Sequence, residues 1–247
     1  MTNYEQAKHI GILAHSAEGS SLCYLAAVHE GIRRMGEHMH PDISLDIIPM
    51  ALAMPLYAKK ELRLVRDILV KSIDRLAAAG CDFFICPDNT AHMALEMPGD
   101  DFPLPGLHIA GVVAGEAARK GFRKIGVLGT KWTMEGPLYK EAFQRVGLDS
   151  EAPGEKDRIF IDDVIFDELC NGIFSEESQK EYVRIISGLA DKGCDAVVLG
   201  CTEIPLLISP EISPLPTLDS TRALAVAAID VALTEQPMPT WRGGPAG

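Results

Sequence analysis

Two short polar segments, each placed directly after an apolar run, carry the side chains best suited to chemistry. The segment PDNTAH contains Asp88 and follows CDFFIC, and the segment GCTEIP contains Cys201 and follows CDAVVL. A carboxylate and a thiolate are both competent bases, and their protonated forms are acids. Either side chain could therefore take up or release a proton at the end of its apolar run.

Each of these two residues also has a structural alternative. Asp88 could simply cap a helix, and Cys201 could be one more buried cysteine. The two side chains differ strongly in acidity, because the reference pKa values of Asp and Cys, about 3.9 and 8.5, differ by ~4.6 units. The resting pair would be a carboxylate and a thiol unless burial raises the pKa of Asp88. Helix N-termini near a strand end could, in turn, make the thiol more acidic.

Polar residues near these positions are candidates for holding a substrate carboxylate, although capping a helix is the alternative for each. They are Asn89, Thr90, Thr133 and Thr202, with Ser16 in the small-residue turn AHSAEGSS as part of the pocket wall. Three further residues could support the acid–base groups or an anionic intermediate, or could lie on a surface or helix face: His92, Glu203 and Lys131.

Composition excludes several classes of partner. The net charge of -12 argues against nucleic-acid binding, which needs a basic surface. The six cysteines form no CxxC pair, and His38 and His40 have no third ligand nearby, so we expect no metal. No apolar run has the length of a membrane span, and the sequence does not open with a signal-peptide pattern, so we expect a cytoplasmic protein without a membrane partner.

The order of apolar and amphipathic segments predicts an α/β fold with parallel sheets. The strand HIGILAH (9–15) precedes a helical stretch that runs to about Arg34, and an amphipathic stretch over 59–79 leads into CDFFIC. The pattern then restarts, because KIGVLGT (124–130) echoes HIGILAH and GCDAVVLGC echoes GCDFFICPD. The two echoes are 115 and 113 positions apart, which indicates an internal duplication.

Two pseudo-symmetric parallel α/β domains are therefore expected, with the active site in a cleft between them. The first would hold residues 1–107 and 213–236, the second 108–212, and residues 237–247 would form a disordered tail. Ligands of open parallel sheets bind beyond the carboxyl ends of the strands. Because Asp88 and Cys201 occupy equivalent places in the two copies, we expect them on opposite walls of that cleft.

These segments, with IGVLGTKWTMEGPLY between them, resemble the aspartate/glutamate racemase family over essentially the whole chain. The resemblance implies an isomerase that needs no pyridoxal phosphate or other cofactor, acts on a small carboxylate substrate and often forms a homodimer. It also implies a two-base mechanism, in which one residue removes the α-proton and its counterpart returns a proton on the other face. Asp88 and Cys201 would be the two bases.

The sequence departs from the family pattern where chemistry is expected. Asp88 stands where most members have cysteine, and Cys170, in FDELCNG, stands where many aspartate racemases have a lysine for the substrate's side-chain carboxylate. Aspartate is therefore a doubtful substrate. Two alternatives remain: a decarboxylase or cis–trans isomerase of the same fold that uses Cys201 as its main catalytic residue, and a non-catalytic ligand-binding protein.

Overall fold

The computed structural model describes residues 4–246, which divide into two compact units. Unit 1 comprises the described residues up to Ile109 and those from Thr221 onward, and unit 2 comprises Ala110–Ser220.

Each unit contains a four-stranded parallel sheet with the same strand order, which confirms the predicted duplicated α/β fold. The strands of unit 1 are β1 (Ile10–Ala14), β2 (Ile43–Ile47), β3 (Phe83–Ile85) and β4 (Gly106–Leu107), in the order β2-β1-β3-β4. Those of unit 2 are β5 (Lys124–Gly129), β6 (Asp149–Glu151), β7 (Ala196–Gly200) and β8 (Thr217–Asp219), in the order β6-β5-β7-β8.

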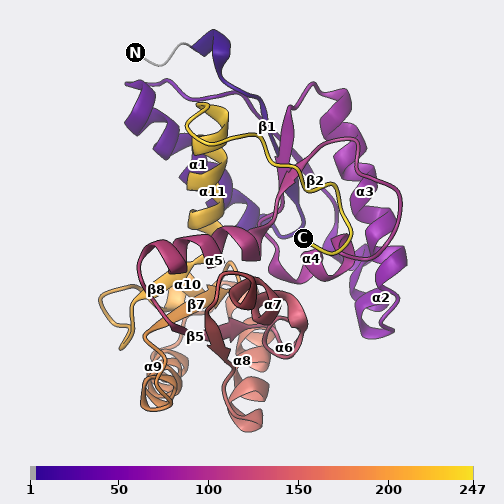
Figure 1. Cartoon of the computed structure of the whole chain (residues 1–247). Coiled ribbons are helices and arrows are strands. Elements are labelled where there is room, and N and C mark those ends of the chain that lie inside the picture. Colours follow the sequence, from indigo (N-terminus) through magenta and orange to yellow (C-terminus); the bar gives the residue numbers. More distant parts are fainter. Residues whose placement is uncertain (1–3, 247) are drawn as a thin grey trace. The chain divides into compact units, whose positions relative to one another are not determined.

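Helices cover both faces of the unit 1 sheet, as its fully buried central strands require. On one side lie α1 (Ala17–Met35) and α11 (Ser220–Ala232), joined by an ion pair of 2.6 Å between Arg34 and Asp230 (Figure 1). On the other side lies α3 (Leu62–Ala78), with the short helices α2 (Met54–Ala58) and α4 (Asn89–Leu95) nearby (Figure 1). Short 3-10 turns cover Tyr4–Gln6 and Met50–Leu52.

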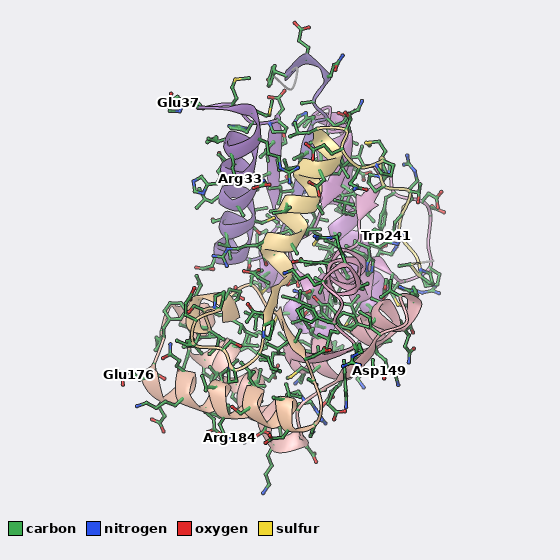
Figure 2. All side chains as sticks on the ribbon, turned by 60° about the vertical axis from the view of Figure 1, so that its left-hand side comes forward. Arg33, Glu37, Asp149, Glu176, Arg184 and Trp241 are labelled. Carbon is green, nitrogen blue, oxygen red and sulfur yellow. The ribbon has the colours of Figure 1, made fainter. Side chains whose placement is uncertain are left out.

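Unit 2 has a large apolar core that involves its sheet and its longest helices. Its helices are α5 (Ile109–Arg119), α6 (Lys131–Glu135), α7 (Pro137–Arg145), α8 (Glu155–Asp167), α9 (Glu176–Asp191) and α10 (Ile204–Leu207), with a 3-10 turn at Leu169–Asn171. Residues such as Ile161 of α8, Ile186 of α9 and Val197 of β7 meet in this core and are fully buried. The opposite face of α9 is charged and exposed, and Glu176 and Arg184 project from it (Figure 2).

The repeated Gly-Cys-Asp has one structural role in both units. The glycine follows a helix with a positive φ of 85° in each copy, a conformation that glycine adopts without strain. In unit 1 the carboxylate of Asp82 accepts a hydrogen bond of 2.8 Å from the backbone N–H of His9, just before β1. In unit 2 Asp195 accepts one of 3.1 Å from the N–H of Lys124, at the start of β5. In both units the motif therefore ties the turn before one central strand to the start of its neighbour.

Both domain boundaries and the C-terminal segment differ from the sequence prediction, and unit 1 first ends at Ile109 instead of residue 107. The chain returns to unit 1 at Thr221 instead of residue 213, because β8 pairs with β7 and so belongs to unit 2. The C-terminal segment, predicted to be disordered, instead packs on unit 1 as far as it is described. Trp241 forms a bridge with Gly106 and its ring stacks on His92, with 5.8 Å between the ring centroids. One large aromatic ring supplies the apolar contact area that orders the segment.

Candidate functional site

In unit 1 the register of the sheet brings Asp88 to His15. Strands β1 and β3 pair Ile10 with Phe83 and Ile12 with Ile85. The same register, continued past the strand ends, makes His15 and Asp88 the next polar pair. Their side chains meet, since Nδ1 of His15 lies 2.8 Å from Oδ2 of Asp88. Sequence analysis missed His15, and the signal that could have found it is its place at the end of the first strand.

The other oxygen of Asp88 caps helix α4. Oδ1 accepts a hydrogen bond of 3.1 Å from the backbone N–H of Ala91, so each carboxylate oxygen has a donor. Burial alone would raise the pKa of Asp88, but the hydrogen bond and charge of His15, with the N–H of Ala91, lower it below its usual value. Asp88 is therefore ionised at neutral pH.

His92, a candidate supporting residue, is a buried neutral histidine that fixes the start of α4. Its Nδ1 lies 2.9 Å from the backbone oxygen of Asp88, and its Nε2 accepts the N–H of Ile109 at 3.3 Å. A carbonyl oxygen only accepts, so the proton must be on Nδ1 and the lone pair on Nε2. Burial, followed by the charge of nearby His108, lowers the pKa of His92 to about 3. His92 thus positions the backbone of Asp88 and does not exchange protons at neutral pH.

Because His92 is buried in its neutral form, we expect the folded protein to lose stability at acidic pH. Its pKa is lowered from 6.5 to about 3, so below pH 6.5 the unfolded chain binds a proton that the folded chain does not. Stability is therefore lost as the pH falls through this window, by up to about 1.4 kcal/mol per pH unit for this one group. We expect His92→Gln to flatten the dependence of the free energy of unfolding on pH between 5 and 7, measured in urea. His38→Gln, at an exposed histidine, should leave it unchanged.

The remaining candidates of unit 1 begin helices. Asn89 and Thr90 are the first residues of α4, directly after Asp88, and Asn89 is buried. Ser16 is the N-cap of α1, where its hydroxyl accepts the backbone N–H of Gly19 at 3.3 Å. The structure therefore gathers Asn89 and Thr90 beside the His15–Asp88 pair and places Ser16 next in the chain to His15. Any contact of these three residues with a substrate stays a prediction.

In unit 2 Cys201 follows β7 and is held by a buried carboxylate. Its thiol donates a hydrogen bond of 3.0 Å to Oε2 of Glu203, and the hydroxyl of Thr202 donates one of 2.7 Å to the same oxygen. Burial, the negative charge of Glu203 and this hydrogen bond raise the pKa of Cys201 well above its usual value. The backbone N–H of Glu203, at the start of α10, lowers this pKa as expected, but burial and the Glu203 carboxylate outweigh it.

Close packing of two glycines places Thr133 near the ends of the central strands of unit 2. A Cβ on Gly129 would lie 2.8 Å from the backbone oxygen of Gly200 and 2.9 Å from the methyl carbon of Thr133. The methyl group of Thr133 therefore fits only because both strands end in glycine. Its hydroxyl lies 3.3 Å from that of Thr130, the N-cap of α6.

Lys131 begins α6 and contacts an acidic side chain of α8. Its backbone N–H and its ammonium group contact Asp162, at 2.7 and 3.9 Å, and its ammonium lies over the ring of Trp132. The positive charge of Lys131 is thus partly balanced by a carboxylate of its own unit. The exposed Cys170, in contrast, is near enough to Cys201 for its negative charge, when ionised, to raise the pKa of that thiol.

Two kinds of site are absent from the part of the chain that the structure describes. Among residues 4–246, no three His, Cys, Asp or Glu side chains gather in a way that could hold a metal ion. In the same range no helix has the length and apolar character needed to cross a membrane.

The fold and these side chains together define a class: a duplicated parallel α/β protein with ionisable groups at equivalent strand ends. The sequence profile named Asp/Glu/Hydantoin racemase matches residues 10–228. The chain therefore belongs to the Asp/Glu/hydantoin racemase family.

Individual relatives agree with this assignment. The glutamate racemase of Aquifex aeolicus (strain VF5) is 29% identical over 161 residues, a match covering 63% of this chain but only 61% of that enzyme. The broad specificity amino-acid racemase RacX of Bacillus subtilis (strain 168) is 22% identical over 179 residues, which cover 70% of this chain and 74% of RacX. A crystal structure from Yersinia pestis, assigned to the Asp/Glu racemases, superposes with a TM-score of 0.80 at 29% identity and covers 92% of this chain and 99% of that one.

Proposed function

We propose that this protein is a cofactor-independent racemase or epimerase that moves a proton at the carbon α to the carboxylate of an amino acid or similar small acid. Asp88, in unit 1, and Cys201, in unit 2, belong to its two acid–base centres. One observation carries the proposal: equivalent strand ends of a duplicated fold hold groups in opposite protonation states. The pKa of Asp88 is lowered and that of Cys201 is raised.

Opposite protonation is what a two-base reaction requires. The centre at Asp88 rests as a base and can remove the α-proton of one enantiomer. Cys201 rests as a thiol and can deliver its proton to the resulting carbanion, after which the two centres have exchanged states. The carboxylate of Glu203 accepts the thiol hydrogen bond at rest and so keeps the proton on sulfur until it is needed. Asn89, Thr90, Thr133, Thr202 and Ser16 are proposed to hold the substrate carboxylate.

Other features of the proposal come from the family. We propose that the enzyme is a cytoplasmic homodimer that binds no nucleic acid or membrane and uses no pyridoxal phosphate. Light scattering of the purified protein would test the dimer. Full activity after exhaustive dialysis against a carbonyl reagent such as hydroxylamine would support independence from pyridoxal phosphate, and loss of activity would refute it.

The test of the function is α-proton exchange in D2O, followed by NMR for both enantiomers of each common amino acid and for related carboxylic acids. Entry of deuterium at the α-carbon with loss of optical activity supports the racemase. Release of CO2 from aryl malonates would indicate the decarboxylase alternative, in which Cys201 donates a proton alone. Conversion of maleate to fumarate would indicate the cis–trans isomerase. Tight binding with no turnover would indicate a ligand-binding protein.

We expect the enzyme to prefer neutral over acidic substrates, because Cys170, which is close to Cys201, carries no positive charge. A substrate with an acidic side chain would bring a charge into the site without a lysine to pair with it, and such a charge is costly to bury. We expect kcat/KM for L-aspartate to be lower than for the best neutral amino acid. Cys170→Lys should raise the aspartate value at least tenfold, with Cys170→Met as the uncharged control. A parent enzyme that prefers aspartate to every neutral amino acid would contradict this prediction.

A further inference from the structure

We propose that the atom of unit 1 that takes and returns the substrate proton is Nε2 of His15, and that Asp88 is the positioning residue that orients this imidazole. The inference rests on the proposed function and refines one of its two acid–base centres. The inference starts from a contact that the sequence motifs did not predict: Nδ1 of His15 lies 2.8 Å from Oδ2 of Asp88.

The contacts of Asp88 make it a better anchor than base. One oxygen accepts the N–H of Ala91 and the other faces His15, so the carboxylate is already engaged on both sides. Its pKa is lowered despite burial, and a weaker base accepts a carbon-bound proton less readily. The ionised carboxylate also selects the tautomer of its neighbour, because only a protonated Nδ1 can donate to it.

The remaining ring nitrogen of His15 then carries the lone pair. His15 is only 3% exposed, and its Nε2 is buried with no hydrogen-bond partner among residues 4–246. Buried polar atoms are nearly always bonded, and an exception calls for an explanation such as catalysis. A histidine with Nδ1 on a carboxylate and a free Nε2 is the arrangement by which imidazoles act as general bases.

The titratable groups around this pair are held neutral at pH 7. Tyr57, on α2, has its ring 6.5 Å from that of His15, and burial, then the charge of Asp88, raises its pKa well above the usual value. Burial likewise raises the pKa of Cys86 well above its usual value, and burial lowers that of His92 to about 3. These three side chains therefore exchange no protons near neutral pH.

The proton balance of the reaction supports this choice. Nε2 accepts the α-proton and becomes part of an imidazolium–carboxylate ion pair with Asp88, while the C–H electron pair stays on the substrate as a carbanion that Cys201 then protonates. The reference pKa values of histidine and cysteine differ by about 2 units, against ~4.6 for aspartate and cysteine. On these reference values histidine is closer in basicity to a thiol than aspartate is, and the raised pKa of Cys201 adds to the difference in either case.

The first test uses His15→Asn and needs a compound that the panel above has shown to exchange. An asparagine amide can replace Nδ1–H as donor to Asp88 but has no counterpart of Nε2. We expect α-deuteration to fall by 10²- to 10⁴-fold for the enantiomer deprotonated by unit 1, with the urea-unfolding midpoint nearly unchanged. His9→Asn, at the other end of β1, is the matched control and should keep parent activity. If the rate of α-deuteration by His15→Asn is within fivefold of the parent rate, Asp88 and not His15 is the group that transfers the proton.

A second measurement does not depend on any substrate. In protein labelled with ¹⁵N-histidine, the two-bond ¹H–¹⁵N correlation pattern of His15, identified by its loss in His15→Asn, should report the Nδ1–H tautomer. Asp88→Asn should shift it to the Nε2–H tautomer, because an amide N–H then faces Nδ1. A parent protein with the Nε2–H tautomer would overturn the proposal. If no compound exchanges with the parent, the proposed function fails, while this measurement still decides whether Nε2 is a free proton acceptor.

Discussion

Replacing Cys201 by serine is expected to lower racemisation by about 10²- to 10⁴-fold, the usual contribution of one general acid–base group. The serine hydroxyl can make the same hydrogen bond to Glu203, so unit 2 should stay folded. It cannot, however, deliver and recover a proton as a thiol does. The assay is loss of optical activity of the best substrate, with circular dichroism and the urea midpoint as measures of folding. Cys194→Ala, at the buried cysteine of the second Gly-Cys-Asp motif, should keep parent activity.

Deuterium exchange adds a directional readout to the Cys201→Ser variant. If Cys201 is one of two bases, the enantiomer that it deprotonates should lose exchange almost completely. The other enantiomer, deprotonated in unit 1, should be affected less, because its first step does not use Cys201. Equal losses for both enantiomers would indicate that Cys201 acts through substrate binding, and an active Cys201→Ser enzyme would remove it from the mechanism.

The central part of each sheet could be predicted from the sequence because burial leaves a strong pattern. Strands β1, β3, β5 and β7 are apolar runs with polar segments at their ends, and the duplication repeats them at nearly constant spacing. The edge strands β4, β6 and β8 are only two or three residues long and have no such pattern. That missing signal explains why the boundary at residue 213 was wrong: β8 could not be seen.

The positions of Asp88 and Cys201 after buried strands could be predicted, but their immediate partners could not. Asp88 and Cys201 follow buried strands, and in parallel sheets this places them at the ligand-binding edge. The partner of Asp88, His15, is 73 residues earlier in the chain and is brought in by the register of β1 with β3, which sequence patterns do not specify. The direction of the Cys201 pKa depends on how Glu203 turns its carboxylate, and that too is a tertiary property.

Asp88 makes two contacts that separate substitutions can distinguish. The sequence left open whether this residue is a helix cap or a base, and the structure shows that it caps α4 while its second oxygen contacts His15. Capping uses one carboxylate oxygen, and the other oxygen contacts His15. A substitution that keeps the cap and removes the charge therefore separates the two roles.

Asp88→Asn is that substitution. Asparagine caps helices about as well as aspartate, so we expect the free energy of unfolding to change by about 1 kcal/mol or less. Racemisation should nevertheless fall by at least 10²-fold, because an amide can neither accept the α-proton nor hold His15 with its proton on Nδ1. Ser175→Ala, which removes the side-chain cap of α9 in unit 2, is the converse control. It should cost about 1 kcal/mol of stability and leave the rate unchanged.

The two catalytic variants should also differ in the enantiomer that they spare. Asp88→Asn disables the base of unit 1, so exchange should persist best for the enantiomer that Cys201 deprotonates, the opposite of the result expected for Cys201→Ser. Initial rates of deuteration, measured from each enantiomer for the parent and both variants, give this comparison directly. If both variants spare the same enantiomer, the protein does not use one base from each unit. An Asp88→Asn enzyme as fast as the parent from both enantiomers would reduce Asp88 to a helix cap, because a group needed for proton transfer cannot be neutralised without a change in rate.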